Sequence, residues 1–228
     1  MATVSSRRPP RKVVYPTSDG KPMAETDDHR YLMVDLIETQ RMHFEAVPNV
    51  YVSGNLLMYY VRGNPRKHIS PDVFVVFGVP KHNRDYYLVW EEGKSPDVVF
   101  ELTSKSTRME DQRTKLEIYR DILKVKEYFL FDPHGDYLDP RLQGYRLRAG
   151  RYTRIRPVDN RLPSQVLGLH LEQNGNELRL HNPATGQWLP TPNEVRKQLE
   201  ERQESVEAEN ARLRSELEEL RRRRNGQR

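Results

Sequence analysis

The chain has 228 residues, with 38 Lys and Arg against 33 Asp and Glu, so its formal net charge is +5. It has no cysteine, which excludes disulfides, thiolate metal sites and cysteine nucleophiles. No apolar run approaches the roughly 20 residues that a membrane-spanning helix needs, and no apolar segment follows the basic N-terminal residues as it would in a secretory signal. We therefore expect a cytoplasmic protein with no membrane partner.

Three parts are expected along the chain. Residues 1–30 are rich in proline, serine and charged residues and predict a disordered arm. Residues 31–192 form the candidate domain, and residues 193–228 form a charged helical tail. Residues 31–193 keep 22 basic and 20 acidic residues, so the domain is close to neutral. Because nucleic-acid binding needs a basic face rather than a basic total, the net charge supports it only weakly.

The elements of the domain alternate between helix and strand patterns. An amphipathic helix is expected over 31–46 and strands over 71–77, 86–90 and 97–103, while 49–60 suits a strand or a helical turn. The capping-box spacing of Thr107 and Glu110 then predicts a helix that buries Leu116, Tyr119, Ile122 and Leu123. A strand at 126–131 and a hairpin follow. This order predicts an α/β or α+β fold with a mixed central sheet flanked by helices.

The tail has a seven-residue repeat of apolar positions. Its members, taken as d positions, are Leu199, Val206, Leu213 and Leu220. The a positions are then Arg196, Gln203, Asn210 and Leu217. Because an asparagine at a favours a parallel dimer, the repeat predicts a coiled coil and a homodimer through this helix. The alternative is a single charged helix held by i,i+4 ion pairs.

Two acids lie in the apolar strand patterns. Asp72 opens PDVFVVF, and Glu101 lies within VVFELT. An ionised carboxylate in such a run costs several kcal/mol unless a basic side chain or a metal neutralises it. Carboxylate ligands suit Mg²⁺ or Mn²⁺. The two acids can meet only if the registers of their strands permit it, and the sequence does not fix those registers.

Two further charged residues bear on this pair. Asp97 repeats the Pro-Asp pattern, but it lies four residues before Glu101, or about 13 Å along an extended strand. It therefore suits a strand start better than a shared metal site. Lys115, on the capped helix, lies at the edge of the buried face, from which it could reach Glu101. On spacing alone, an ordinary surface lysine is the favoured interpretation of Lys115.

Several segments in order carry a family resemblance. Asp72 in SPDVFVV, the run PDVVFELTSKSTRMEDQRTKLEIYR, then VKEYFLFDP and LQGYRL resemble the Uma2 family of restriction-type endonucleases, within the PD-(D/E)XK nuclease superfamily. The resemblance implies a restriction-endonuclease-like sheet and a metal-dependent site. In this resemblance, Asp72 and Glu101 correspond to the two acids of the superfamily site. The lysine of that site corresponds to residue 103, where this chain has Thr103, and the resemblance implies that Lys115 replaces it.

The resemblance also implies a mechanism and a wider set of candidate residues. Asp72, Glu101 and the backbone carbonyl of Leu102 would bind Mg²⁺ or Mn²⁺, and Lys115 would hold the attacking water or the phosphate of a DNA substrate. The lower-ranked candidates are Lys105 as a second lysine, Glu45 as a further carboxylate, Tyr119 beside Lys115, and Asp97. Two alternatives stay open, namely a weakly active or inactive nuclease fold that binds or scaffolds through its tail, and a nuclease directed at RNA or linked to transposons.

Overall fold

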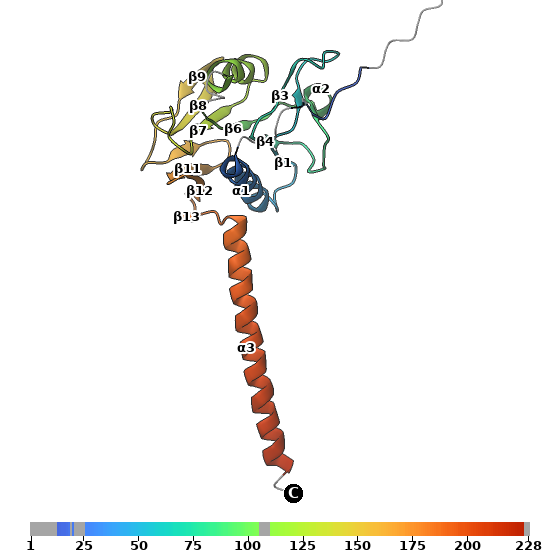
Figure 1. The fold of residues 1–228 in the computed structure, drawn as a ribbon, viewed down its shortest axis with the longest axis vertical. Coiled ribbons are helices and arrows are strands. Elements are labelled where there is room, and N and C mark those ends of the chain that lie inside the picture. Colours follow the sequence, from blue (N-terminus) through green and yellow to red (C-terminus); the bar gives the residue numbers. More distant parts are fainter. Residues whose placement is uncertain (1–12, 19, 21–25, 105–109, 226–228) are drawn as a thin grey trace, which may run out of the picture. The chain divides into compact units, whose positions relative to one another are not determined.

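The computed structural model describes residues 13–18, 20, 26–104 and 110–225. The chain forms two compact units, Met1–Leu189 and Pro190–Arg228. The first is a mixed α/β unit, and the second consists mainly of one long helix (Figure 1). Within the described residues, no helix has both the length and the apolar character required to span a membrane.

The first unit is built on a six-stranded sheet in the order β1-β4-β6-β7-β8-β9. The pair β6–β7 is parallel and its other neighbouring strands are antiparallel, so the prediction of a mixed sheet is confirmed. The central strands β6 and β7 are fully buried, and the sheet centre is rich in β-branched and aromatic residues, which suit a pleated interior. The strands are β1 (Val50–Ser53), β4 (Val73–Phe77), β6 (Val98–Leu102), β7 (Glu127–Phe131), β8 (Leu142–Arg148) and β9 (Arg151–Arg154).

One face of this sheet packs against helix α1 (Asp27–His43) and a four-stranded antiparallel sheet. Leu32 and Leu36 of α1 join Val73, Phe100 and Leu171 in one buried cluster. Because side chains alternate along a strand, this face takes every second residue of β4 and β6. The strands of the second sheet are β10 (Leu162–Ser164), β11 (Leu169–Asn174), β12 (Glu177–Asn182) and β13 (Gln187–Trp188).

The other face of the central sheet carries a second buried cluster. Val99 and Tyr128 of the sheet pack there with Tyr119 and Leu123 from the following helical segment. A small three-stranded sheet in the order β3-β2-β5 contributes to the same cluster. Its strands are β2 (Met58–Tyr59), β3 (His68–Ile69) and β5 (Tyr87–Leu88), followed by the short helix α2 (Val89–Glu92).

The helical segment after β6 differs from the expected α-helix. It is wound as two π-helical stretches, η1 (Glu110–Lys115) and η2 (Ile118–Ile122), and the N–H of Leu123 donates to the carbonyl of Ile118 at 2.9 Å. The wider π-turn rotates the third residue after Tyr119 off the buried face, so Ile122 is 51% exposed although its position in the sequence predicted burial. Thr107, half of the predicted capping box, lies outside the described residues.

The folded unit begins before residue 31, where the sequence pattern predicted its start. Helix α1 begins at Asp27, because the Thr26 hydroxyl accepts a hydrogen bond from the backbone N–H of His29 and caps the helix. Tyr15 packs edge-on against Tyr59, with the ring centroids 5.0 Å apart, and the Tyr59 hydroxyl donates to the carbonyl of Pro16 at 2.6 Å. The expected arm therefore contributes aromatic packing to the small sheet.

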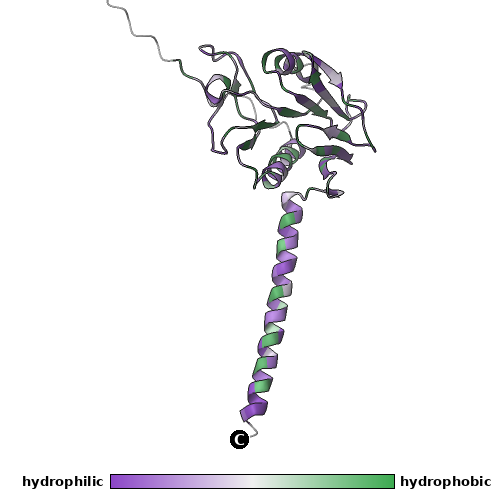
Figure 2. Cartoon of the chain, turned by 180° about the vertical axis from the view of Figure 1, so that it is seen from behind, coloured by the Kyte–Doolittle hydropathy of each residue, from purple (hydrophilic) through white to green (hydrophobic). Residues whose placement is uncertain are grey.

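The second unit contains helix α3 (Pro192–Asn225), and none of its residues is buried. Ion pairs four residues apart run along it, including Arg212 with Glu216 at 3.0 Å. Apolar segments recur along the otherwise hydrophilic helix (Figure 2). They include the expected d-position residues, which are 45–60% exposed.

Candidate functional site

The register between β4 and β6 brings the two acids of the sequence pattern together. Val73 pairs with Phe100 in an antiparallel ladder, so the same register places Asp72 opposite Glu101 and on the same face of the sheet. A carboxylate oxygen of Asp72, Oδ2, accepts a hydrogen bond from the backbone N–H of Leu102 at 2.8 Å. The two carboxylates therefore lie at one end of the β4–β6 pair, on the face covered by η1 and η2.

Glu101 is completely enclosed by protein. Its side chain has no exposed area, the Lys115 ammonium lies 2.7 Å from Oε2, and the Tyr119 hydroxyl donates to Oε1 at 2.5 Å. Burial raises the pKa of Glu101 well above its ordinary value, with further increases from the charges of Asp72 and Asp111, and Lys115 opposes the shift. Glu101 therefore needs a compensating positive charge to ionise.

Lys115 supplies that charge from η1. Its ammonium also lies 3.0 Å from Oδ1 of Asp111, one helical turn earlier, and the side chain is only 11% exposed. Burial alone would lower the pKa of Lys115, but the carboxylates of Glu101, Asp111 and Asp72 raise it above the ordinary lysine value. Lys115 is thus a buried, protonated lysine in contact with two acids, and not the surface lysine that its spacing also allowed.

Asp111 is a site residue that the sequence analysis missed. It is buried, and its Oδ2 accepts a hydrogen bond from the Thr103 hydroxyl at 2.8 Å, while that hydroxyl also contacts the Tyr137 hydroxyl. Thr103, where the family resemblance led us to expect a lysine, therefore holds an acid that faces Lys115. The available signal was the i,i+4 spacing of Asp111 and Lys115, which places both on one side of a helix.

Asp72 has a second partner that the sequence analysis did not single out. His29 Nε2, from the first turn of α1, lies 3.2 Å from Asp72 Oδ2, and both side chains are 15% exposed. Burial favours the neutral form of Asp72, but the hydrogen bond from His29, the charge of Lys115 and the N–H of Leu102 outweigh it and hold the pKa of Asp72 below its ordinary value. The contact depends on the packing of α1, so no local pattern predicts it.

Gly54 allows the backbone that follows β1 to pack directly against the backbone of Asp72. A Cβ added at Gly54, which follows β1, would come within 2.0 Å of the Asp72 carbonyl oxygen and 2.7 Å of an Ile37 methyl group. The next residue, Asn55, donates its N–H to the carbonyl of Pro71 at 2.8 Å. The end of β1 therefore fixes the backbone that carries Asp72.

The remaining candidates lie in different places. Tyr119 contacts Glu101 directly, and the N–H of Leu102 contacts Asp72. Lys105 lies outside the described residues. Asp97 lies at the opposite end of β6, where its Oδ2 accepts from the N–H of Phe77 at 2.8 Å.

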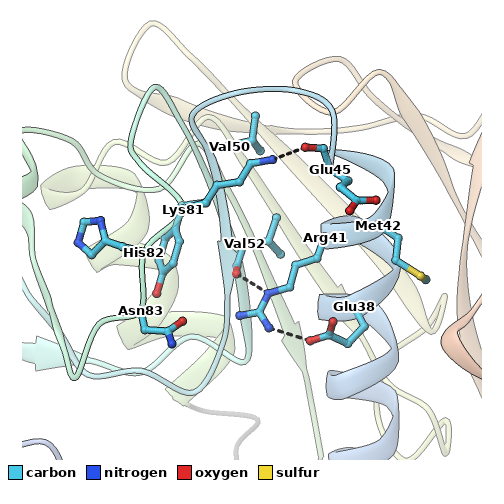
Figure 3. A pocket seen from close by; sticks show the side chains of 10 residues that line it. Glu38, Arg41, Met42, Glu45, Val50, Val52, Lys81, His82 and Asn83 are labelled. Atoms are coloured by element: carbon cyan, nitrogen blue, oxygen red, sulfur yellow. Dashed lines mark hydrogen bonds and ion pairs between the residues drawn. The ribbon is translucent and has the colours of Figure 1, made fainter.

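Glu45 lies far from the acids. It follows the C-terminal end of α1, whereas His29 reaches Asp72 from the N-terminal end. The 14 helical steps from His29 to His43 alone correspond to about 21 Å at 1.5 Å per residue. Glu45 lines a separate pocket of about 450 Å³ beside β1 (Figure 3). There Lys81 donates to the Glu45 carbonyl at 2.9 Å, and Arg41 donates to the carbonyl of Val52 at 3.0 Å. The helix contributes a histidine to the site in place of the expected carboxylate.

The acids suit a hard divalent cation in chemistry and in charge. Asp72, Glu101 and Asp111 bring three carboxylates to one buried region against the single lysine Lys115, and burial together with the charges of the other two acids raises the pKa of Glu101. Oxygen ligands with excess negative charge favour Mg²⁺ or Mn²⁺. Among the described residues, no three acidic or histidine side chains already form a metal-binding group. Binding would therefore require Glu101 or Asp111 to exchange its contact with Lys115 for the ion.

A mixed sheet with paired acids and a lysine at one end defines a restriction-endonuclease-like protein. The chain belongs to the Uma2 family, described as "Putative restriction endonuclease", whose sequence model matches residues 7–191. Among solved structures, it is similar to "a putative nuclease belonging to DUF820 from Anabaena variabilis", with a TM-score of 0.46 and 17% identity over 68% of this chain and 85% of that chain. None of the curated proteins matches it.

Proposed function

We propose that the protein is a metal-dependent endonuclease that hydrolyses phosphodiester bonds of DNA. The observation that carries the proposal is the meeting of Asp72, Glu101 and Lys115 at one end of the β4–β6 pair. Membership of the Uma2 family supports the nuclease class. The metal, the DNA substrate and the roles of the individual residues are our inference from the chemistry of the site.

The residues that would hold the metal are Asp72, Glu101 and the backbone carbonyl of Leu102. In a β-strand the N–H and C=O of one residue point to the same side. Since the N–H of Leu102 donates to Asp72, its carbonyl is expected on the same side. When bound, Mg²⁺ lowers the pKa of a coordinated water and offsets the negative charge of the scissile phosphate.

Lys115 and Tyr119 have complementary roles in this proposal. The three surrounding carboxylates favour the protonated form of Lys115, so it acts as a fixed positive charge that stabilises a phosphate in the transition state. Burial raises the pKa of Tyr119 well above its ordinary value, so the tyrosine stays neutral and donates its proton to Glu101 in a hydrogen bond. We therefore assign Tyr119 the role of orienting Glu101.

The alternative function is a nuclease fold that binds or scaffolds without cutting. One observation favours it, because Lys115 and Tyr119 already occupy both oxygens of Glu101 and make a closed, charge-paired cluster. A buried cluster of this kind can be purely structural. The two functions differ in whether the cluster opens to a divalent ion.

Cleavage of supercoiled plasmid tests the proposal directly. We expect the full chain to nick or linearise the plasmid with Mg²⁺ or Mn²⁺, to be inactive with EDTA, and to lose activity on Glu101→Gln. The matched control is Glu127→Gln, because Glu127 is also a buried glutamate but faces the other side of the sheet, where Arg146 donates to it at 2.8 Å. The control should retain cleavage below its own melting temperature.

Three outcomes would count against the proposal. Equal cleavage by wild type and Glu101→Gln would place the activity elsewhere. Cleavage of single-stranded RNA but not of plasmid would support the RNA-directed alternative. Absence of cleavage on both substrates, with circular dichroism showing a folded protein, would favour the scaffold function.

A further inference from the structure

Helix α3 carries an unpartnered apolar seam. The described helix runs from Pro192 to Asn225, which is about 51 Å at 1.5 Å per residue, and none of its residues is buried. An isolated polar helix of this kind gains its stability from i,i+4 ion pairs or from a partner. The apolar side chains recur on one stripe and are strongly exposed, namely Leu199 60%, Val206 49%, Leu213 45%, Leu217 54% and Leu220 60%.

We propose that a second copy of this chain covers the seam in a parallel, in-register, two-stranded coiled coil. The inference goes beyond the heptad repeat because it rests on the charges beside the seam, which specify both the partner and its direction. It does not depend on nuclease activity.

The charges beside the seam are complementary in a parallel pair. In that arrangement each g residue faces the e residue five positions later on the other chain. The facing pairs are Arg202 with Glu207, Glu209 with Arg214, and Glu216 with Arg221. All of them are of opposite sign. Glu216 also pairs with Arg212 of its own chain at 3.0 Å. In the dimer its carboxylate would therefore contact both Arg212 of its own chain and Arg221 of the second chain.

An antiparallel pair of the same helices is disfavoured. It would align each a position with a d position and bring g against g and e against e. With the four heptads aligned end to end, Glu207 would face its own copy and so would Glu209, while Glu200 would face Arg214 and Arg202 would face Glu216. Asn210 would face Val206 instead of a second asparagine. Like charges at the centre and an unpaired polar group in the core both oppose this arrangement.

The proposed pairing has a consequence for the nuclease units. In a parallel coil both helices begin at the same end, so the two units that precede Pro192 are attached at that end of the dimer. If the proposed function holds, two sites would be available to one duplex, whose strands are related by two-fold symmetry.

Single cysteines test the direction and the register in the full chain, which has no cysteine of its own. In the proposed dimer two copies of Leu213 face each other across the core, so Leu213→Cys should form a disulfide-linked dimer on mild oxidation. Ser215→Cys, on the outer face of the same turn, is the matched control and should stay largely uncrosslinked. Equal crosslinking of the two variants would overturn the proposal.

Charge reversal tests the pairing without touching the core. Glu209→Arg with Glu216→Arg gives one variant, and Arg214→Glu with Arg221→Glu gives the other. Each should self-associate about tenfold or more weakly than wild type, and the equimolar mixture should recover dimers, as measured by light scattering during size exclusion. The inference would be overturned by a monomeric wild type, or by variants that dimerise as strongly as wild type. It would also be overturned if Leu213→Cys formed a disulfide with Gln203→Cys but two Leu213→Cys chains formed none with each other.

Discussion

The two ends of the β4–β6 pair carry the same motif in different surroundings. At each end a Pro-Asp dipeptide precedes one strand. The aspartate accepts a hydrogen bond from a backbone N–H at the end of the other strand. Asp72 accepts from Leu102 and Asp97 accepts from Phe77, both at 2.8 Å. In backbone terms the two aspartates are equivalent.

The side chains that reach each end make the difference. Asp97 pairs with Lys126, which is 62% exposed, at 2.7 Å and with Lys94 at 3.8 Å, so solvent-facing cations balance its charge. Asp72 instead lies opposite a second buried acid, Glu101. The buried ammonium of Lys115 pairs with Glu101 and with Asp111. The motif thus supplies a strand-capping carboxylate, and elements from elsewhere in the chain decide whether it meets a second buried acid or solvent-facing lysines.

The largest expected difference between the two ends is in catalysis. Asp72→Asn and Asp97→Asn each weaken one hydrogen bond between a charged group and the backbone, so we expect similar losses of stability, about 1.5–3 kcal/mol. Cleavage of plasmid with Mg²⁺ should fall on the order of 100-fold or more for Asp72→Asn and remain near wild type for Asp97→Asn. Equal activities in the two variants would remove the distinction between the ends.

A smaller effect is expected on the stability of the Asp72 end. Lys115→Met leaves the buried carboxylate of Glu101 without its cation, so the free energy of unfolding should fall by about 3–5 kcal/mol in urea titrations. The double variant Glu101→Gln with Lys115→Met should recover much of this loss, because the uncompensated charge is gone. Lys126→Met, at the Asp97 end, should cost less than about 1 kcal/mol because that pair is exposed on the lysine side. If the losses in the free energy of unfolding from the two single substitutions simply add in the double variant, Glu101 and Lys115 do not interact directly.

The smallest expected effect is proton release on metal binding. Burial raises the pKa of Glu101 well above its ordinary value, so as the pH falls Glu101 takes up a proton that a divalent cation must displace. The apparent affinity for Mg²⁺ should therefore increase as the pH rises, and calorimetry in two buffers of different ionisation enthalpy should detect released protons. Glu101→Gln should abolish the release and Asp97→Asn should preserve it. A wild-type affinity independent of pH would argue against Glu101 as a ligand.

Local patterns in the sequence determined a large part of this structure. The short apolar runs of β-branched or aromatic residues in 71–77, 97–103 and 126–131 placed the central strands, and the position of Glu101 among apolar residues marked it as a buried acid. The departure at Thr103 and the nearby Lys115 were also visible in the sequence. These features depend on neighbours a few residues apart, and such short-range periodicity can be read directly from a sequence.

Only the tertiary structure decided which residues meet. The Val73–Phe100 register, which sets Asp72 opposite Glu101, depends on pairing between strands far apart in the chain, and a shift by one residue would send Asp72 to the other face. The contact of His29 with Asp72 depends on how α1 packs. The π-helical winding of η1 and η2 contradicted an α-helical pattern. Long-range packing sets these features, so spacing along the chain could name the acids and the lysine but could not bring them together.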